Sequence, residues 1–518
     1  MDIVKNAKKK LKINKYFLIN KEPLLFDAVN NTMSLFKIFA TENCLIDASY
    51  HKLNSGDILV ENEIFSEGNS IKIKTKVSFH DENEKLSFKD VVNTANFKHN
   101  KLECTQKLVK LNIFSLMKEI TGINPSTWGI LRGVRPTKIV HKLLDENKTV
   151  EEVLAILRHK YAITSEKADL ITNIATYQKS ISCLNKIENS RVVSVYIGIP
   201  YCPSRCLYCS FPSYTIPEHE EQLDSFLTAL KLDILNAAEL IKDKDFTVES
   251  IYIGGGTPTS LSNSDFFKLI SLVKENLVTR DTKEFTVEAG RPDSITAQKI
   301  ETLSSFGINR ISINPQTMQD KTLAIIGRNH SAQDVIDAIE KIRQITNFSV
   351  NINMDVIIGL PGETEEDLID TMEKISLLSP ENITIHTLAI KNNSILKDHL
   401  KETVLPDIET TTKMLEIAKS YAVKLNMIPY YLYRQKNMTG NLENIGYATP
   451  GTECLYNIKI IEERQSIIGI GPVAGTKAVN FENWSLESCY NPKDIFTYIN
   501  NLEYYLKKRK NLFDKITL

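Results

Sequence analysis

The sequence has almost no net charge and no long apolar run. Its 63 Lys and Arg residues nearly cancel its 64 Asp and Glu residues, whereas proteins that coat nucleic acids carry a clear basic excess. No run of about 18 apolar residues could cross a bilayer, and no apolar segment follows the basic residues 8–10 as in a secretory leader. We therefore expect a cytoplasmic protein with no nucleic-acid partner and no membrane span.

Cysteine is also scarce, and its distribution is uneven. Eight cysteines in 518 residues are too few for a disulfide framework. Cys202, Cys206 and Cys209 fall within one short segment, which in a reducing compartment indicates a metal site. The others are scattered and are expected to be small buried residues: Cys44, Cys104, Cys183, Cys454 and Cys489.

The hydrophobic pattern divides the chain into four ranges. Residues 1–105 contain alternating segments, such as residues 71–79, mixed with helical ones, and predict an α+β N-terminal domain. The period changes to 3.6 in residues 106–187, which predicts a helical segment. Residues 401–518 begin with a helical stretch, then short strands and glycine-rich turns predict a small α+β C-terminal domain that covers the substrate.

Residues 188–400 predict an α/β fold, an open partial (β/α)6 barrel. Val- and Ile-rich runs alternate with amphipathic helical stretches such as residues 332–345, the pattern of a parallel sheet buried on both faces. We place strands at residues 192–199, 248–254, 284–289, 310–315, 349–358 and 383–388. In such sheets the working residues follow the carboxyl ends of the strands.

The first strand leads into a cysteine motif of the form C-x3-C-x2-C. Because an iron-sulfur cubane usually takes four cysteines, a cubane held by Cys202, Cys206 and Cys209 leaves one iron open to a substrate or cofactor. The alternative is a structural zinc ion, which needs a fourth ligand. The nearest downstream candidate is His219, and that spacing is not a standard zinc finger.

Other strand ends carry residues suited to a polar ligand. Gly254-Gly-Gly-Thr-Pro258 follows the second strand, and its glycines allow close backbone approach. Further strand ends offer polar acceptors, and Arg328 is a cation able to bind a carboxylate in bidentate fashion. These acceptors are Glu288, Gln316 and Asp355.

One string outside the barrel supports two interpretations. Trp128-Gly-Ile-Leu-Arg-Gly-Val-Arg-Pro-Thr-Lys138 combines two glycines with clustered cations. It could form a phosphate or carboxylate grip, or it could be a turn between helices whose cations face solvent.

The cysteine motif, with Tyr196 six residues before it and Tyr208 before its last cysteine, resembles the radical S-adenosylmethionine (SAM) superfamily. Residues 192–477 resemble more closely the oxygen-independent coproporphyrinogen III oxidases, in the long variant of spore-forming anaerobes and their relatives. That resemblance rests on Tyr-Ile-Gly-Ile-Pro-Tyr-Cys-Pro, Gly-Gly-Gly-Thr-Pro-Thr, Val-Glu-Ala, Pro-Gln-Thr, Met-Asp-Val-Ile-Ile-Gly-Leu-Pro-Gly and Tyr-Ala-Thr-Pro-Gly-Thr-Glu-Cys. The long variant is indicated by the 128–138 string and by Tyr430-Tyr-Leu-Tyr-Arg-Gln-Lys436.

The resemblance implies a site and a reaction. It implies a 4Fe-4S cluster on the three cysteines, Tyr208 beside it, and one or two SAM molecules bound by Tyr196, Gly255, Gly256, Thr257, Glu288, Gln316, Arg328, Asp355 and Ala389. It implies that a SAM-derived radical starts the oxidative decarboxylation of two propionates of coproporphyrinogen III, which yields protoporphyrinogen IX in haem biosynthesis. The implied partners are this tetrapyrrole and an electron donor such as flavodoxin or ferredoxin.

Two departures from the family pattern leave other functions open. Leu455-Tyr456-Asn457 stands where relatives commonly carry Arg-His-Asn, and Gly290-Arg291-Pro292 stands in place of the usual Asn-Pro. One alternative is a haem-binding chaperone of the same family, although Tyr456 replaces the family histidine. The other is a different radical SAM reaction on a tetrapyrrole. Arg434 and Lys436 are candidate contacts for propionates, with solvated surface charge as their alternative role.

Overall fold

The computed structural model describes residues 15–19, 25–46, 53–81, 84–97, 100–181, 190–216, 219–436 and 438–515 of the chain. Two compact units form, one from residues 1–133 and 142–172 and the other from residues 134–141 and 173–518. This division differs from the four ranges expected from the sequence, because residues 106–187 contribute to both units and residues 188–518 lie in one.

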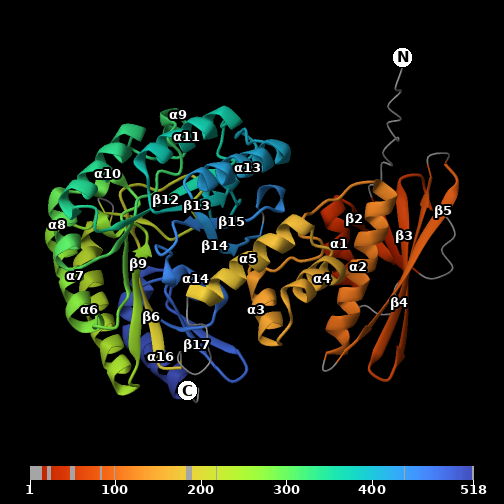
Figure 1. The fold of residues 1–518 in the computed structure, drawn as a ribbon, viewed down its shortest axis with the longest axis horizontal. Helices are drawn as coiled ribbons and strands as arrows, with labels where there is room; N and C mark the ends of the chain where they lie inside the picture. The colour runs from red at the N-terminus through yellow and green to blue at the C-terminus, as the bar shows by residue number, and fades with distance from the viewer. Residues whose placement is uncertain are drawn as a thin grey trace. The chain divides into compact units, whose positions relative to one another are not determined.

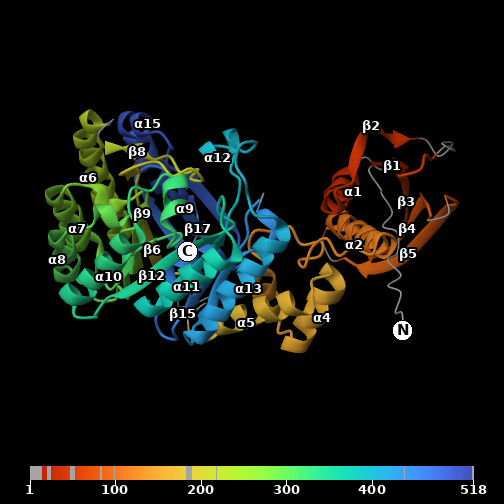
Figure 2. The same ribbon diagram turned by 90° about the horizontal axis from the view of Figure 1, so that it is seen from above.

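The first unit contains a five-stranded sheet with helices packed on one face (Figures 1 and 2). Its strand order is β2-β1-β3-β4-β5, antiparallel from β3 to β5. Alternating apolar side chains of β4, such as Ile71 and Ile73, share a core with Val109 and Ile113 of α2. The elements are β1 (Lys15–Ile19), α1 (Phe26–Met33), β2 (Phe39–Ile46), β3 (Asp57–Glu67), β4 (Ser70–His80), β5 (Leu86–Asn96), α2 (Lys101–Thr121) and α4 (Val150–Tyr161). α3 (Thr137–Asp145) and α5 (Ser165–Ile181) contribute residues to both units.

The second unit is built on an eleven-stranded sheet whose centre is the partial barrel. The strand order is β14-β15-β13-β12-β11-β10-β9-β6-β16-β17-β18, and neighbours from β6 to β13 are parallel. The six strands expected from the sequence are confirmed as β6 (Val192–Ile199), β9 (Thr247–Gly255), β10 (Glu284–Glu288), β11 (Arg310–Ser312), β12 (Asn351–Ile358) and β13 (Asn382–Thr387). β11 is shorter than expected because Pro315 lacks an N–H for the ladder and Gln316 adopts a φ of 68°.

Helices cover the outer face of the barrel strands (Figure 1). Each begins where side chains change from strand to helical periodicity, and several begin with a capping side chain, such as Ser331 before α10 and Thr364 before α11. The barrel helices are α6 (Glu220–Asp243), α7 (Asn263–Leu277), α8 (Ala297–Ser305), α9 (Asp320–Ile325), α10 (Ala332–Thr346), α11 (Glu365–Leu378), α12 (Ile395–Asp398) and α13 (Ile408–Lys424). The helix-to-strand turns lie at the amino ends of the strands. The carboxyl ends therefore remain the expected place for a site.

The last range of the chain extends the barrel sheet on both sides. β14 and β15 add antiparallel strands beside β13, whereas β16 pairs in parallel with β6. Arg509 of α16 forms a buried ion pair with Asp233 of α6 at 2.6 Å, which ties the C-terminal helix to the barrel. These elements are β14 (Ile428–Tyr433), β15 (Asn444–Ala448), α14 (Leu455–Glu462), β16 (Ser466–Ile470), β17 (Gly475–Val479), β18 (Leu486–Tyr490), α15 (Ile495–Asn500) and α16 (Leu502–Lys515).

Neither a membrane helix nor a disulfide scaffold emerges from the described part of the chain. None of its helices combines the length and the apolar character needed to cross a bilayer. Cys454 and Cys489 are buried, as expected, and Cys104 is half-buried. The side chains of Cys44 and Cys183 lie outside the described residues.

Candidate active site

The cysteine motif lies on the loop that follows β6. Cys202 belongs to the short strand β7 (Tyr201–Cys202), which pairs with β8 (Tyr214–Thr215). The amide of Cys209 donates to the carbonyl oxygen of Cys206 at 3.2 Å, so the last two cysteines share one turn. The amide of Leu207 donates to the Ile326 oxygen at 3.0 Å, which anchors the loop to the end of α9. The three thiols are therefore held at the carboxyl ends of the barrel strands.

Burial makes the cysteine site a poor place for free thiolates. It raises the pKa of Cys202 to about 12 and also raises the pKa of Cys209. A metal that displaces the thiol protons would supply the missing positive charge. Among the residues that the structure describes, no three Cys, His, Asp or Glu side chains are placed to hold one metal ion. A single zinc ion would need its ligands around one metal, whereas in a cubane each thiolate binds a different iron.

The glycine segment lies directly against the cysteine loop. The amide of Gly256 donates to the Ile199 oxygen and the amide of Thr257 to the Tyr201 oxygen, both at 2.7 Å. A Cβ on Gly256 would lie 2.5 Å from the Tyr201 oxygen, and Gly255 has a φ of 105°. The Thr257 hydroxyl lies 3.7 Å from the Cys202 sulfur. Only glycine at position 256 lets this backbone approach the loop so closely.

Glu288 ends β10 as a half-buried acceptor beside the glycines. Its Oε1 accepts a hydrogen bond from the Tyr252 hydroxyl at 2.6 Å, and its Oε2 accepts one from the Gly255 amide at 3.1 Å. Burial raises the pKa of Glu288 to about 7, and the nearby Asp355 carboxylate adds to the rise. A cationic ligand group would favour the charged form and lower this pKa.

Gln316 follows β11 and pairs with β12 beside Asp355, which lies within that strand, whereas Arg328 follows α9. The amide of Gln316 donates to the Asp355 oxygen at 2.9 Å. The guanidinium of Arg328 donates to the Gly290 oxygen at 3.1 Å and to the Tyr208 hydroxyl at 3.3 Å. The Oε1 of Gln316 and the Nε of Arg328 are buried and have no hydrogen-bond partner among the described residues. Because such atoms are costly to leave unpaired, they fit a site that receives a polar ligand.

Three tyrosine rings stack beside Glu288 and the glycine segment. The Tyr196 ring stacks with Tyr252 at 6.2 Å and with Tyr456 at 5.9 Å between centroids. The Tyr252 and Tyr456 rings are 4.7 Å apart. Sequence reasoning overlooked Tyr252, although it precedes Gly254 by two residues and so points to the same face of β9. It also overlooked His386 of β13, whose Nε2 lies 3.6 Å from the Asp355 carboxylate.

The remaining candidates lie in different surroundings. Ala389 pairs with Met438 in an isolated antiparallel bridge beyond β13. Arg434 is buried, and its guanidinium donates to the Asn441 side-chain oxygen at 2.5 Å. Lys436 is exposed. Solvated charge therefore describes Lys436 but not Arg434, and the contacts of Arg434 are to the protein itself.

The string at residues 128–138 runs from the first unit into the second. It forms a turn in the first unit and ion pairs in the second. Gly129 has a φ of 55° and packs against the Tyr161 oxygen, where a Cβ would lie 2.1 Å away. Arg135 and Lys138 bind the Glu463 carboxylate at 2.7 and 2.6 Å. These cations already have a carboxylate partner, which favours the connecting-turn interpretation over a ligand grip.

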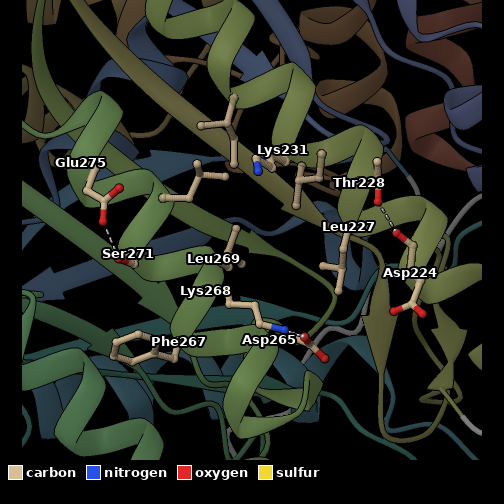
Figure 3. Close-up of a pocket in the computed structure, with 13 residues that line it drawn as sticks. Asp224, Leu227, Thr228, Lys231, Asp265, Phe267, Lys268, Leu269, Ser271 and Glu275 are labelled. Carbon is tan, nitrogen blue, oxygen red and sulfur yellow. Dashed lines mark hydrogen bonds and ion pairs between the residues drawn. The ribbon is translucent and has the colours of Figure 1, made fainter.

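A groove of about 510 Å³ lies elsewhere on the barrel, between α6 and α7. Figure 3 shows that it is lined by helix residues such as Leu227 and Phe267, with the Lys268–Asp265 ion pair beside them. It contains none of the predicted site residues. The candidate site is therefore the strand-end cluster, not this groove.

Glu288 should make SAM binding depend on pH if the site binds SAM. Above a pH of about 7 the carboxylate is charged and attracts the ligand's ammonium, so the affinity should rise as pH increases through this range. Glu288→Gln should weaken SAM about tenfold or more at pH 8 and remove this dependence. Calorimetry under anaerobic conditions measures both. Glu462→Gln is the matched control, because burial likewise raises the pKa of Glu462 to about 7; equal losses in both variants would refute the assignment.

Comparison with known proteins identifies relatives of this chain. Residues 196–375 match the Radical SAM superfamily. The chain is 39% identical over 449 residues to the oxygen-independent coproporphyrinogen-III oxidase-like protein HemZ of Bacillus subtilis, covering 86% of each protein. It is 32% identical to the heme chaperone HemW of Bacillus subtilis over 55% of this chain and 73% of that protein. The structure of coproporphyrinogen III oxidase HemN from Escherichia coli aligns with a TM-score of 0.49 and 18% identity, covering 64% of this chain and 72% of that one.

Proposed function

Because this chain belongs to the radical SAM superfamily, in the family of oxygen-independent coproporphyrinogen-III oxidase-like proteins, we propose that it oxidatively decarboxylates two propionates of coproporphyrinogen III. The product is protoporphyrinogen IX. Proteins of this superfamily use a 4Fe-4S cluster and SAM. Bound together, these groups supply a 5′-deoxyadenosyl radical that abstracts hydrogen.

The observation that supports this proposal is the convergence of donors and acceptors around the three cysteines. We assign the cluster to Cys202, Cys206 and Cys209, the strand-end loop that offers three thiols. The glycine backbone at 255 and 256 would lie along the methionine part of SAM. The Glu288 carboxylate would accept a hydrogen bond from the ammonium group of SAM, and Arg328 would bind the carboxylate of SAM. The buried side-chain oxygen of Gln316, which has no hydrogen-bond partner among the described residues, would accept a hydrogen bond from a ligand hydroxyl.

The other residues would position the ligand and exclude water. The rings of Tyr196, Tyr252 and Tyr456 form a closely packed apolar wall. Asp355 would accept a hydrogen bond from the ligand as a charged carboxylate. Burial acts to raise its pKa, but the nearby His386 and Asn353 lower it overall. Tyr208 and Ala389 would complete the site, for which the family resemblance implies one or two SAM molecules. The residues after 400 would cover the tetrapyrrole, and a flavodoxin or ferredoxin would supply electrons.

A haem chaperone is the second candidate, because the heme chaperone HemW of Bacillus subtilis is also similar to this chain. Tyr456 stands where the resemblance expects histidine. Its ring is buried in the tyrosine stack, and burial raises its pKa well above 10. A neutral buried phenol is a poor ligand for haem iron, since phenol ligation uses the phenolate. This favours the enzyme over the chaperone.

An anaerobic assay with the reconstituted protein, SAM, reductant and coproporphyrinogen III tests the proposed reaction. We expect 5′-deoxyadenosine together with a porphyrin whose mass has fallen by the equivalent of formic acid, twice. Cleavage of SAM without decarboxylation would contradict the substrate, and a mass gain would indicate methylation instead. A stable complex with added haem, observed by its Soret band, and no SAM cleavage would favour the chaperone.

A further inference from the structure

Arg291 is a buried cation that follows β10 and reaches the cysteine loop. It stands in the Gly290-Arg291-Pro292 sequence, immediately before a short 3-10 helix at Pro292–Ser294. Its side chain is 3% exposed. A buried guanidinium is costly to desolvate and is retained where it has definite partners.

The partners of Arg291 belong to the segment between the first two cysteines. Its Nη1 lies 3.9 Å from the Cys206 sulfur and donates to the Ser204 carbonyl oxygen at 3.3 Å. Its Nη2 donates to the Ser204 hydroxyl at 2.9 Å. That hydroxyl donates in turn to the Gly327 oxygen at 2.8 Å, just before Arg328. One guanidinium therefore holds the loop and places a positive charge beside a cysteine sulfur.

The charged groups around Arg291 compensate its positive charge only in part. Asp293 is its carboxylate partner, with Oδ1 at 3.3 Å from the Nε atom, and that carboxylate is 25% exposed to solvent. His330 lies 3.9 Å from Asp293. Burial and the charges of Arg328 and Arg291 lower the pKa of His330 to about 4, so it is neutral at physiological pH. Arg291 and the buried Arg328 therefore place positive charge next to Cys206, and the exposed Arg205 adjoins that cysteine in the chain.

We propose that Arg291 is a positioning residue that sets the reduction potential of the cluster at Cys202, Cys206 and Cys209. This inference rests on the proposed cluster and not on the proposed substrate. Reduction adds one negative charge to a cluster already made negative by thiolates. A buried cation that donates to a ligand sulfur stabilises the reduced form more than the oxidised form, and therefore makes the potential less negative.

The neighbouring carboxylate provides a test of opposite sign. Arg291→Gln removes the cation and should lower the reduction potential. Asp293→Asn removes the anion that compensates Arg291 and should raise it. Asparagine keeps a side-chain oxygen for the Arg291 Nη2, which lies 3.4 Å from Asp293, so we expect the contacts of Arg291 to Ser204 to remain.

The experiment is an anaerobic redox titration of the reconstituted full-length protein, followed by electron paramagnetic resonance of the reduced cluster. For Arg291→Gln we expect the ratio of reduced to oxidised cluster at a fixed potential to fall about tenfold, which is about 59 mV for one electron. Asp293→Asn should shift the ratio the other way. Arg291→Lys keeps the charge and should recover most of the wild-type potential.

A matched control separates this effect from the loss of any buried arginine. Arg343 is also buried, but it lies in the last turn of α10, where it donates to the Val350 and Ser379 oxygens and pairs with the Glu381 carboxylate. Arg343→Gln should leave the potential unchanged. Wild-type potentials in both Arg291→Gln and Asp293→Asn, or shifts of both in one direction, would overturn the proposal. If the Arg291→Gln variant does not retain iron, the direction in which Asp293→Asn shifts the reduction potential decides whether the proposal holds. Failure of decarboxylation with these shifts intact would remove only the substrate assignment.

Discussion

Replacing Cys206 and Cys209 together by alanine is expected to abolish iron binding and SAM cleavage while leaving the fold in place. Two thiolates cannot be replaced by protein ligands nearby, since among the described residues no three Cys, His, Asp or Glu side chains are placed to hold one metal ion. Both side chains are small, and Cys206 is surrounded by loop residues that remain anchored by backbone bonds such as Leu207 to Ile326. The apo fold should therefore lose only about 1 kcal/mol per residue.

The measurement is iron and sulfide per chain after anaerobic reconstitution, together with 5′-deoxyadenosine formation and the thermal unfolding midpoint. The wild type should bind roughly four irons and the double variant almost none. Cys489→Ala is the matched control, because Cys489 is buried in β18, where it pairs with Thr476 of β17, and is not one of the three motif cysteines. Full iron content in the double variant would show that the cluster lies elsewhere.

Gly256→Ala is expected to lower SAM cleavage by about 100-fold or more. The added methyl carbon would lie 2.5 Å from the Tyr201 oxygen and 2.8 Å from the Ile199 oxygen. Both atoms are backbone, and both accept hydrogen bonds from this glycine segment at 2.7 Å. Neither can rotate away, so the cysteine loop must move by roughly 1 Å to restore normal contacts, and displacements of that size cost about 100-fold in rate.

Gly133→Ala is the control for this variant. A Cβ on Gly133 would meet only the Leu131 side chain, at an ordinary 3.7 Å, so its activity and cluster content should remain near those of the wild type. SAM cleavage and iron content are measured for both variants in parallel. Wild-type cleavage in Gly256→Ala would mean that the glycine segment does not need its close approach to the cysteine loop.

The barrel strands were predictable because their signal is local. Runs of Val and Ile separated by amphipathic helices identify β6 and β9 to β13 within a few residues. The rule that strand ends carry the working residues then pointed to Glu288, Gln316 and Asp355, which the structure brings together with the glycine segment. Resemblance supplied the SAM roles, which geometry alone does not assign.

The contacts between distant segments were not predictable in this way. The sequence suggests that Arg434 is a surface cation after a strand. In the structure it is buried, because the side-chain oxygen of Asn441, across the following turn, accepts a hydrogen bond from its guanidinium. Arg291 departs from the family pattern in the sequence, but its contact with Cys206 depends on two loops, after different strands, that meet in space. Tyr252 was overlooked because its partners Glu288 and Tyr456 lie far along the chain.

The sequence by itself determined the barrel strands, the three-cysteine loop and the family to which the chain belongs. The strands depend on periodicity and the cysteine loop on spacing over a few residues, which the local backbone expresses directly, whereas the family follows from the resemblance of several motifs. Only the tertiary structure decided that β14 to β18 extend the barrel sheet, and that Arg291 lies against Cys206. A strand's pattern of side chains shows which face is buried but not which strand will be its neighbour. Side-chain pairs between loops depend on that choice.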